Sequence, residues 1–171
     1  MSLIVVALKR NHKVSPFNCG TSQLANWLQQ IARQHQSKGI SATYVLVDPA
    51  VPDTILGYYA INIRALVLIE GLPPDMAKRL PASAPALTLG RLAVDLKARG
   101  RRCGEQLLVD AMRRAKNVAQ QVGGAFLFVD AKDATAAAFY RKYGFVALPS
   151  DSLTLCMRIA DIPLLADATF D

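Results

Sequence analysis

The strongest constraint on the fold is a strand–loop–helix–strand segment in the second half of the chain. Residues 86–94 have strand character, and residues 99–104 form a basic loop that contains glycine. From about residue 105 to Val122, apolar residues recur at helical spacing on one side and polar residues lie on the other. A glycine pair ends this helix, and the short apolar strand 125–129 follows. This order predicts a βαβ unit with two parallel strands and therefore an α/β fold.

The other segments extend this unit into a mixed sheet. Strands are predicted at 4–8, 43–47, 55–63, 145–148 and 153–159, and helical regions from Thr21 or Ser22 to Gly39 and from Asp133 to about Tyr143. Residues 64–85 are rich in glycine and proline, so we expect a surface excursion with one short helix at about 75–80. The predicted order is β-α-β-β-β-α-β-α-β-β, in a mixed central sheet flanked by helices. A length of 171 residues fits a single domain, 1–171, with a peripheral tail after about residue 162.

Composition excludes several classes of protein. Hydrophobic residues make up 52% of the chain, which is too many for a disordered protein. The three cysteines and two histidines are widely spaced, so we expect neither a metal site nor a disulfide framework, and a cytoplasmic location. No apolar run approaches the ~20 residues of a membrane span. Lys9 and Arg10 follow the first apolar run, whereas a secretory signal has its basic residues first.

The positive charge of the chain is concentrated in one window. The net charge is +7, and residues 97–116, with seven basic and two acidic side chains, supply +5 of it. Such an excess favours an anionic partner: nucleic acid, a phosphate ester or a membrane surface. Loop 99–104 lies in this window, and its glycines and the helix N-terminus after it suit a di- or polyphosphate. It matches neither GxxxxGK(S/T) nor GxGxxG, which disfavours a P-loop enzyme and a Rossmann dinucleotide site. From composition alone, a solvated basic turn explains the loop equally well.

Two motifs resemble a known family. The loop Arg99-Gly100-Arg101-Arg102-Cys103-Gly104 is similar to the R/Q-x-x-G-x-G/A acetyl-CoA signature of the GNAT acyltransferase superfamily. Arg102 departs from it, because the family usually has its first glycine there. Further along, residues 136–145 resemble the A-x-x-x-Y-x-x-x-G-F segment of the family, and Asp133 stands where many members carry Asn.

Three other segments narrow the resemblance. Residues 17–28, 57–59 and 89–95 resemble one GNAT subgroup, the toxins of bacterial toxin–antitoxin pairs that acetylate the amino group of aminoacyl-tRNA. The resemblance covers roughly residues 3–160. It implies the GNAT fold, acetyl-CoA as co-substrate without a metal, and aminoacyl-tRNA as the acceptor whose blockage stops translation. It also implies a cognate ribbon-helix-helix antitoxin and a homodimer as partners.

The same resemblance implies roles for individual residues. The backbone of Leu92, Ala93 and Val94 would pair with the pantetheine arm like an added strand. Cofactor contacts are implied for Arg99, Gly100, Arg101, Arg102, Cys103, Gly104, Glu105 and Phe139. Tyr140 matches the position that donates a proton to the leaving thiolate, with direct attack of the amine on the thioester and no acyl-enzyme.

The glutamate content bears on the choice of acceptor. Only Glu70 and Glu105 are present, in the excursion and in the phosphate loop, so no glutamate is placed to act as a general base. A lysine amine with a pKa of ~10.4 is neutral in roughly one molecule in 2,500 at pH 7, whereas an α-amine with a pKa of ~7.8 is neutral in roughly one in seven. The missing base therefore favours an α-amino acceptor. Two alternatives stay open: a housekeeping GNAT that acetylates a small amine or a protein N-terminus, and an inactive GNAT scaffold that binds nucleic acid.

Several residues also have a structural explanation. We expect Cys103 to pack within the loop rather than act as a nucleophile, Trp27 to pack in the core and Asp95 to fix a turn. The default for Arg113, Arg114 and Lys116 is a solvated helix face. If the acceptor is tRNA, some of these bases contact phosphates, and affinity then falls steeply with salt.

Overall fold

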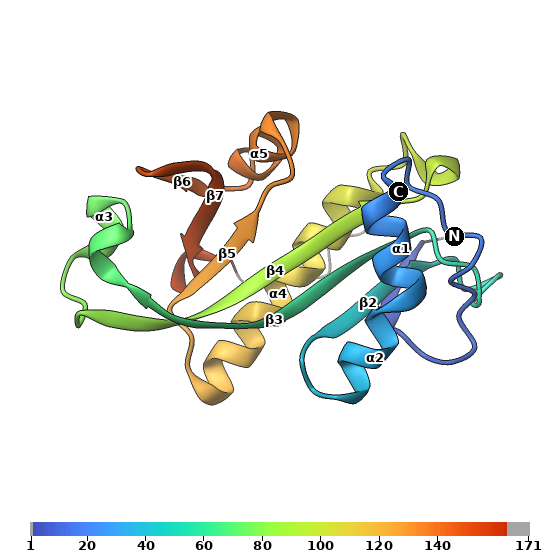
Figure 1. Cartoon of the computed structure of the whole chain (residues 1–171), viewed down its shortest axis with the longest axis horizontal. Helices are drawn as coiled ribbons and strands as arrows, with labels where there is room; N and C mark the ends of the chain where they lie inside the picture. Colours follow the sequence, from blue (N-terminus) through green and yellow to red (C-terminus); the bar gives the residue numbers. More distant parts are fainter. Residues whose placement is uncertain (1, 164–171) are drawn as a thin grey trace. The chain divides into compact units, whose positions relative to one another are not determined.

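The computed structural model describes residues 2–163, in two compact units. One unit comprises residues up to 62 together with 90–111, and the other comprises 63–89 and the described residues from 112 onward. Within these residues, seven strands follow the order β1-β2-β3-β4-β5-β7-β6 in one mixed sheet, which confirms the predicted fold class (Figure 1). A single domain stays a prediction, and the predicted tail lies outside the described residues apart from Pro163.

The first unit packs two short helices on antiparallel strands. Strand β1 (Ile4–Ala7) pairs with β2 (Ala42–Val47), which pairs with the first half of β3 (Gly57–Leu68). The predicted single helical region is two helices, α1 (Ser22–Gln30) and α2 (Ala32–Ser37), because the backbone breaks at Ile31. Their apolar side chains form a core with β2 and β3 that includes Trp27, Leu28, Ala32, Val45, Val47, Tyr58 and Ala60. The core position predicted for Trp27 is thus confirmed.

The second unit contains the parallel pair of the sheet. Strand β4 (Ser83–Val94) runs parallel to β5 (Phe126–Asp130), and β7 (Asp151–Arg158) pairs antiparallel with both β5 and β6 (Val146–Leu148). Helix α5 (Ala134–Arg141) follows β5. Buried apolar residues, among them Ile69, Leu72, Phe126, Phe128 and Cys156, form the core of this unit.

The predicted surface excursion at 64–85 is largely wrong. Strand β3 continues to Leu68 and β4 already begins at Ser83, so only a short connection separates them. That connection holds a 3-10 turn (Ile69–Gly71) and helix α3 (Pro74–Ala77), which is shorter than the helix predicted at 75–80. The strands extend because Val67 and Ala84 pack into the core of the second unit, which outweighs the presence of Pro85 within β4.

Helix α4 (Cys103–Val122) is the long amphipathic helix that the sequence predicts. Leu107, Leu108, Ala111, Met112 and Ala115 on its apolar stripe are buried. Gly123 follows the helix with a φ of 90°, the left-handed conformation that a C-terminal glycine favours. Val122 was predicted in the stripe but is 80% exposed, because it lies at the last helical position. Within residues 2–163 no helix is sufficiently long and apolar to cross a membrane.

The basic face of α4 differs from the solvated face that was expected. Arg113, Arg114 and Lys116 are half-buried rather than exposed. The ammonium group of Lys116 donates hydrogen bonds to the backbone carbonyls of Ala160 and Ile162. These contacts fasten the segment after β7 to the helix, so Lys116 has a structural role.

Candidate active site

The end of β4 leads into the basic loop through a tightly held turn. Asp95 follows β4 and is only 3% exposed. Its Oδ2 accepts a hydrogen bond from the Asn18 amide (3.0 Å) and its Oδ1 accepts one from the Lys97 amide (2.9 Å). The amide of Leu96 in turn donates to the carbonyl of Asn18 (2.9 Å). The expected role of Asp95 in fixing a turn is confirmed, and this buried carboxylate sets where the loop begins.

Upstream of this turn lie the residues expected along the pantetheine arm. Ala93 is buried, and Leu92 and Val94 are half-buried, in the last residues of β4. Gly57 at the start of β3 lies close to them: a Cβ added there would come within 3.0 Å of the carbonyl oxygen of Ala93. The end of β4 is therefore closely packed against the start of β3.

The basic loop adopts a backbone that suits an anion. Gly100 and Arg102 both have positive φ, 80° and 57°. When residues with positive φ alternate with residues with negative φ, successive backbone N–H groups point toward one side of the chain. They then form a concavity that binds an anion. Helix α4 begins immediately afterwards, at Cys103, so the predicted loop is shorter by two residues. The helix adds its free first-turn N–H groups and the positive end of its dipole, which fits a pyrophosphate.

Arg102 adopts the left-handed backbone conformation that is typical of glycine, the residue that the resembling family usually has at this position. Its φ of 57° lies in the left-handed region, which costs a residue with a Cβ about 1 kcal/mol or more. The side chain is 60% exposed and its Nε donates to Oε2 of Glu105 (2.7 Å), one helical turn on. The arginine thus extends over the exterior of the first turn, and Glu105 is occupied by this ion pair.

Two other loop residues are held by the surrounding protein. The guanidinium of Arg99 donates to the carbonyl of Cys19 (3.3 Å), beside Gly20, although the residue as a whole is exposed. Cys103 is 2% exposed, and its thiol contacts the carbonyls of Ala98 (3.5 Å) and Arg101 (3.9 Å). Burial raises the pKa of the Cys103 thiol and opposes the lowering effect of a helix N-terminus. The expectation that Cys103 packs in the loop is confirmed.

The second unit carries Phe139 and Tyr140. Asp133 caps α5 by accepting a hydrogen bond from the Ala136 amide (2.8 Å), as predicted. Tyr140 is 8% exposed, and its ring makes edge contacts with Phe139 (5.3 Å between centroids) and Phe145 (5.8 Å). Burial raises the pKa of Tyr140 to about 12, so its phenol is protonated throughout the physiological range. A protonated, rigidly packed phenol is suited to donate a proton.

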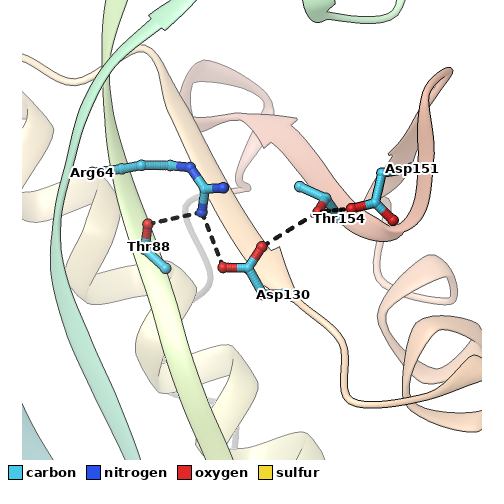
Figure 2. Close-up of polar contacts among 5 residues, drawn as sticks. All are labelled: Arg64, Thr88, Asp130, Asp151 and Thr154. Carbon is cyan, nitrogen blue, oxygen red and sulfur yellow. Dashed lines mark hydrogen bonds and ion pairs between the residues drawn. The ribbon is translucent and has the colours of Figure 1, made fainter.

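Sequence reasoning missed a polar network on the strands of the second unit. Figure 2 shows Arg64 of β3 donating to the hydroxyl oxygen of Thr88 (3.3 Å) and to Oδ2 of Asp130 (3.1 Å), the last residue of β5. Thr154 of β7 links Asp130 to Asp151. A readable signal existed for Asp130, because a charged residue directly follows the apolar run 126–129. No such signal existed for Arg64, which lay in the supposed excursion.

A cation–π contact was also missed. The guanidinium of Arg91, on β4, lies 4.3 Å from the ring centroid of Trp27 on α1. Trp27 in turn stacks on Tyr58, whose hydroxyl donates to the carbonyl of Leu24 (2.7 Å). Among residues 2–163, no three His, Cys, Asp or Glu side chains are grouped to hold a metal ion.

Comparison with known proteins gives the family. Residues 41–147 match the acetyltransferase (GNAT) domain. A tRNA-acetylating toxin of Mycobacterium tuberculosis is 30% identical over 148 residues, which are 86% of this chain and 87% of the relative. The structure of AtaT complexed with acetyl-methionyl-tRNAfMet superposes with a TM-score of 0.85 at 29% identity, covering 94% of this chain and 96% of AtaT.

A second solved structure bears on cofactor and partner. It is a tyrosine-to-phenylalanine variant of AtaT bound to acetyl-CoA and to the C-terminus of the antitoxin AtaR, with a TM-score of 0.78 and 27% identity. It covers 95% of this chain and 96% of the AtaT chain. The resemblance to the tRNA-acetylating toxins is therefore confirmed. By its domain match and by the coverage of its relatives, this chain belongs to the GNAT acetyltransferase family and is an N-acetyltransferase with acetyl-CoA as donor.

Proposed function

We propose that this protein is a toxin that transfers the acetyl group of acetyl-CoA to the α-amino group of aminoacyl-tRNA and thereby blocks translation. The observation that carries the proposal is the similarity of nearly the whole chain to tRNA-acetylating toxins, one of them solved with an acetylated tRNA. In an acetylated amine the nitrogen lone pair is delocalised into the amide carbonyl, so the nitrogen is no longer the nucleophile that peptide-bond formation requires. A single acetyl group per charged tRNA is therefore enough to stop its use.

The loop before α4 is the proposed site for the pyrophosphate of CoA. The backbone N–H groups around Gly100 and those of Cys103, Gly104 and Glu105 at the helix start supply donors, and Arg99 and Arg101 supply charge. Arg102 stays at the rim because its side chain is paired with Glu105. The backbone of Leu92, Ala93 and Val94 would hold the pantetheine arm, and Phe139 would contact the cofactor.

Tyr140 is the proposed general acid. The amine nitrogen forms a bond to the thioester carbonyl carbon, the carbon–sulfur bond breaks, and the electron pair leaves on sulfur. The phenol proton of Tyr140 passes to that thiolate, while the nitrogen gives up its own surplus proton. A pKa of about 12 keeps the phenol loaded with its proton before each turnover.

A basic hollow beside α2 is a candidate contact for tRNA phosphates. It has a volume of about 410 Å³ and is lined by Leu8, Lys9, Arg10, Arg33, Gln34, Gln36 and Ser37, with three cations and no carboxylate. Arg33 is fixed there by hydrogen bonds to the carbonyls of Lys9 (3.0 Å) and His12 (2.5 Å). Cations that are held in place with no carboxylate among the lining residues can bind the phosphates of a nucleic-acid backbone.

The proposal includes partners and a location. A toxin of this kind needs an antitoxin, and AtaT binds the C-terminus of AtaR, so we expect a cognate antitoxin of the ribbon-helix-helix type here. A homodimer stays part of the proposal. Because charged tRNA is a cytoplasmic molecule, the proposed place of action is the cytoplasm.

Acetyl transfer by the purified protein tests the proposal. The protein is incubated with labelled acetyl-CoA and charged tRNAs, and the aminoacyl-adenosine ends are analysed by mass spectrometry. We expect acetylated α-amines on one or more charged tRNAs and none on uncharged tRNA. Preferential acetylation of protein lysines, or of small amines with charged tRNA untouched, overturns it. Growth arrest on expression, relieved by the neighbouring antitoxin gene, is the matching test in cells.

A further inference from the structure

We infer that Asp130 binds the amino group of the acceptor and that Arg64 holds its carboxylate in position. The inference rests on the proposed function in one respect, that the acceptor is a primary amine. It does not require that this amine is carried by tRNA. The sequence offers no glutamate for such a role, whereas the structure presents an aspartate at the end of a central strand.

The position of Asp130 fits a ligand site. The parallel pairing of β4 with β5 runs from Ala86–Phe126 to Leu89–Val129, and Asp130 comes one residue after the last of these pairs. Ligands of open α/β sheets bind beyond the carboxyl ends of the parallel strands. The same end of β5 leads toward α5, the helix that carries Tyr140 (Figure 1).

One oxygen of the carboxylate is held firmly. Side chains alternate along a strand, so Asp130 lies on the same face of β5 as Phe128. The guanidinium of Arg64 lies 4.5 Å from the Phe128 ring centroid and donates to Oδ2 of Asp130 at 3.1 Å. A second bond to Thr88 at 3.3 Å fixes the guanidinium (Figure 2). The Arg64 side chain is 28% exposed, so the guanidinium is partly shielded from water and is held by three partners, unlike one end of a flexible surface pair.

The other oxygen keeps capacity to accept a hydrogen bond. The hydroxyl of Thr154 lies 3.4 Å from Oδ1 of Asp130 but 2.7 Å from Oδ2 of Asp151. A threonine hydroxyl has a single proton, and the shorter contact takes it. Oδ1 of Asp130 therefore keeps its lone pairs, and the side chain is 53% exposed, within reach of an incoming group.

The charge of the cluster matches an amine. The hydrogen bond from Thr154 lowers the pKa of Asp151, which keeps that carboxylate ionised at neutral pH. Two carboxylates and one guanidinium leave one net negative charge, within a chain whose net charge is +7. As the amine attacks the thioester, its nitrogen becomes positive until a proton leaves. Asp130 stabilises that charge and takes the proton, which then passes to water.

An isosteric pair of variants tests this role. Asp130→Asn keeps the shape of the side chain and an oxygen for Arg64 but removes the charge. Asp161→Asn is the control, because it makes the same change in an exposed ion pair with Arg158, outside the network. We expect Asp130→Asn to lower kcat/KM for aminoacyl-tRNA by about 10- to 100-fold, the value of a charge-assisted hydrogen bond, and Asp161→Asn to change it less than about threefold. Acetyl-CoA affinity, measured by calorimetry, should be unchanged in both.

A substrate analogue separates binding of the amine from a structural role. In hydroxyacyl-tRNA the α-amine is replaced by a hydroxyl, so its inhibition constant should be the same for wild type and Asp130→Asn. The inference is overturned if Asp130→Asn loses affinity equally for aminoacyl-tRNA and hydroxyacyl-tRNA. It is also overturned if both variants lose kcat/KM equally. If wild type leaves charged tRNA untouched, the tRNA proposal fails. The role of Asp130 is then tested with amino acid amides and polyamines as acceptors. If Asp130→Asn has the same kcat/KM as wild type for the amine that is acetylated, the inference is overturned.

Discussion

Arg102 shows how a residue can replace a glycine without changing the backbone. The position requires a positive φ, and its side chain is directed to Glu105 rather than across the anion-binding concavity. The exposed ion pair with Glu105 contributes at most about 1 kcal/mol, comparable to the cost of the left-handed backbone. Local strain and local pairing therefore nearly offset each other.

Substitution of Arg102 by glycine and by alanine separates these effects. Both variants lose the ion pair, but only alanine keeps a Cβ in the left-handed conformation. We expect Arg102→Gly to be more stable than Arg102→Ala by about 1 kcal/mol, measured by urea unfolding. At Arg101, whose φ is not positive, the order should reverse, because glycine there only adds chain entropy to the unfolded state. The same order at both positions contradicts the backbone explanation.

Tyr140→Phe removes the proposed acid and leaves the ring contacts with Phe139 and Phe145 in place. We expect the rate of acetyl transfer to fall by about 10²–10⁴-fold, with acetyl-CoA affinity by calorimetry nearly unchanged. Tyr143→Phe, in the same aromatic group, is the control and should retain most activity. Unchanged turnover in Tyr140→Phe removes this residue from the mechanism.

The pH dependence follows from the raised pKa of Tyr140. The folded-state pKa of about 12 lies above the ordinary value of 10, so the protonated phenol is favoured by folding. This contribution to stability is complete below pH 10 and is lost as the pH rises toward 12. Between pH 6 and 9 we expect kcat/KM to rise as the acceptor amine, with a pKa of ~7.8, loses its proton, and not to fall again. A descending limb within that range contradicts a protonated Tyr140 as the acid.

At the scale of elements, close packing around the start of β3 fixes the end of β4. A Cβ on Gly57 would lie 2.8 Å from the Leu107 side chain on α4 and 3.0 Å from the carbonyl oxygen of Ala93. Tyr59 adds a hydrogen bond to Asp110 of the same helix (2.6 Å). The elements that hold the proposed pantetheine strand are thus in direct contact, and space there is limiting.

Gly57→Ala should therefore destabilise the protein by about 1–3 kcal/mol through overpacking. Gly71→Ala is the matched control, since a Cβ there meets no atom within 4 Å, and it should be near neutral. Urea midpoints of the two variants give the comparison. Equal effects at both glycines would falsify the packing argument.

At the scale of the whole molecule, the positive charge has at least three separate uses. Some basic residues lie in the loop before α4. Others, such as Lys116, hold the fold together through hydrogen bonds to backbone carbonyls. A third group, Lys9, Arg10 and Arg33, lines the hollow beside α2. The net charge of +7 is therefore not a measure of tRNA affinity. Bases whose charge is not already engaged by a carboxylate are the ones suited to replace counterions.

Salt dependence tests the hollow as a tRNA contact. The Lys9→Ala, Arg10→Ala double variant should weaken tRNA binding at low salt and reduce the slope of log Kd against log salt by about 1 for each phosphate that the protein no longer neutralises. Lys78→Ala removes one charge from a base that is already paired with Asp75, and it should leave the slope unchanged. An unaltered slope in the double variant shows that tRNA binds elsewhere.

Local sequence patterns specify the order of the strands, the long amphipathic helix, the Asp133 cap and the glycine-containing basic loop before that helix. Each of these is written in neighbouring residues: a periodicity, a capping side chain or a glycine. The tertiary structure decided the length of β3 and β4, the structural use of Lys116 and the Arg64–Asp130 network. Those features join residues far apart in the chain or depend on burial, which local sequence patterns do not record. The apolar run 126–129 marks Asp130 as a charged residue at a strand end, but its partner Arg64 became evident only with three strands side by side.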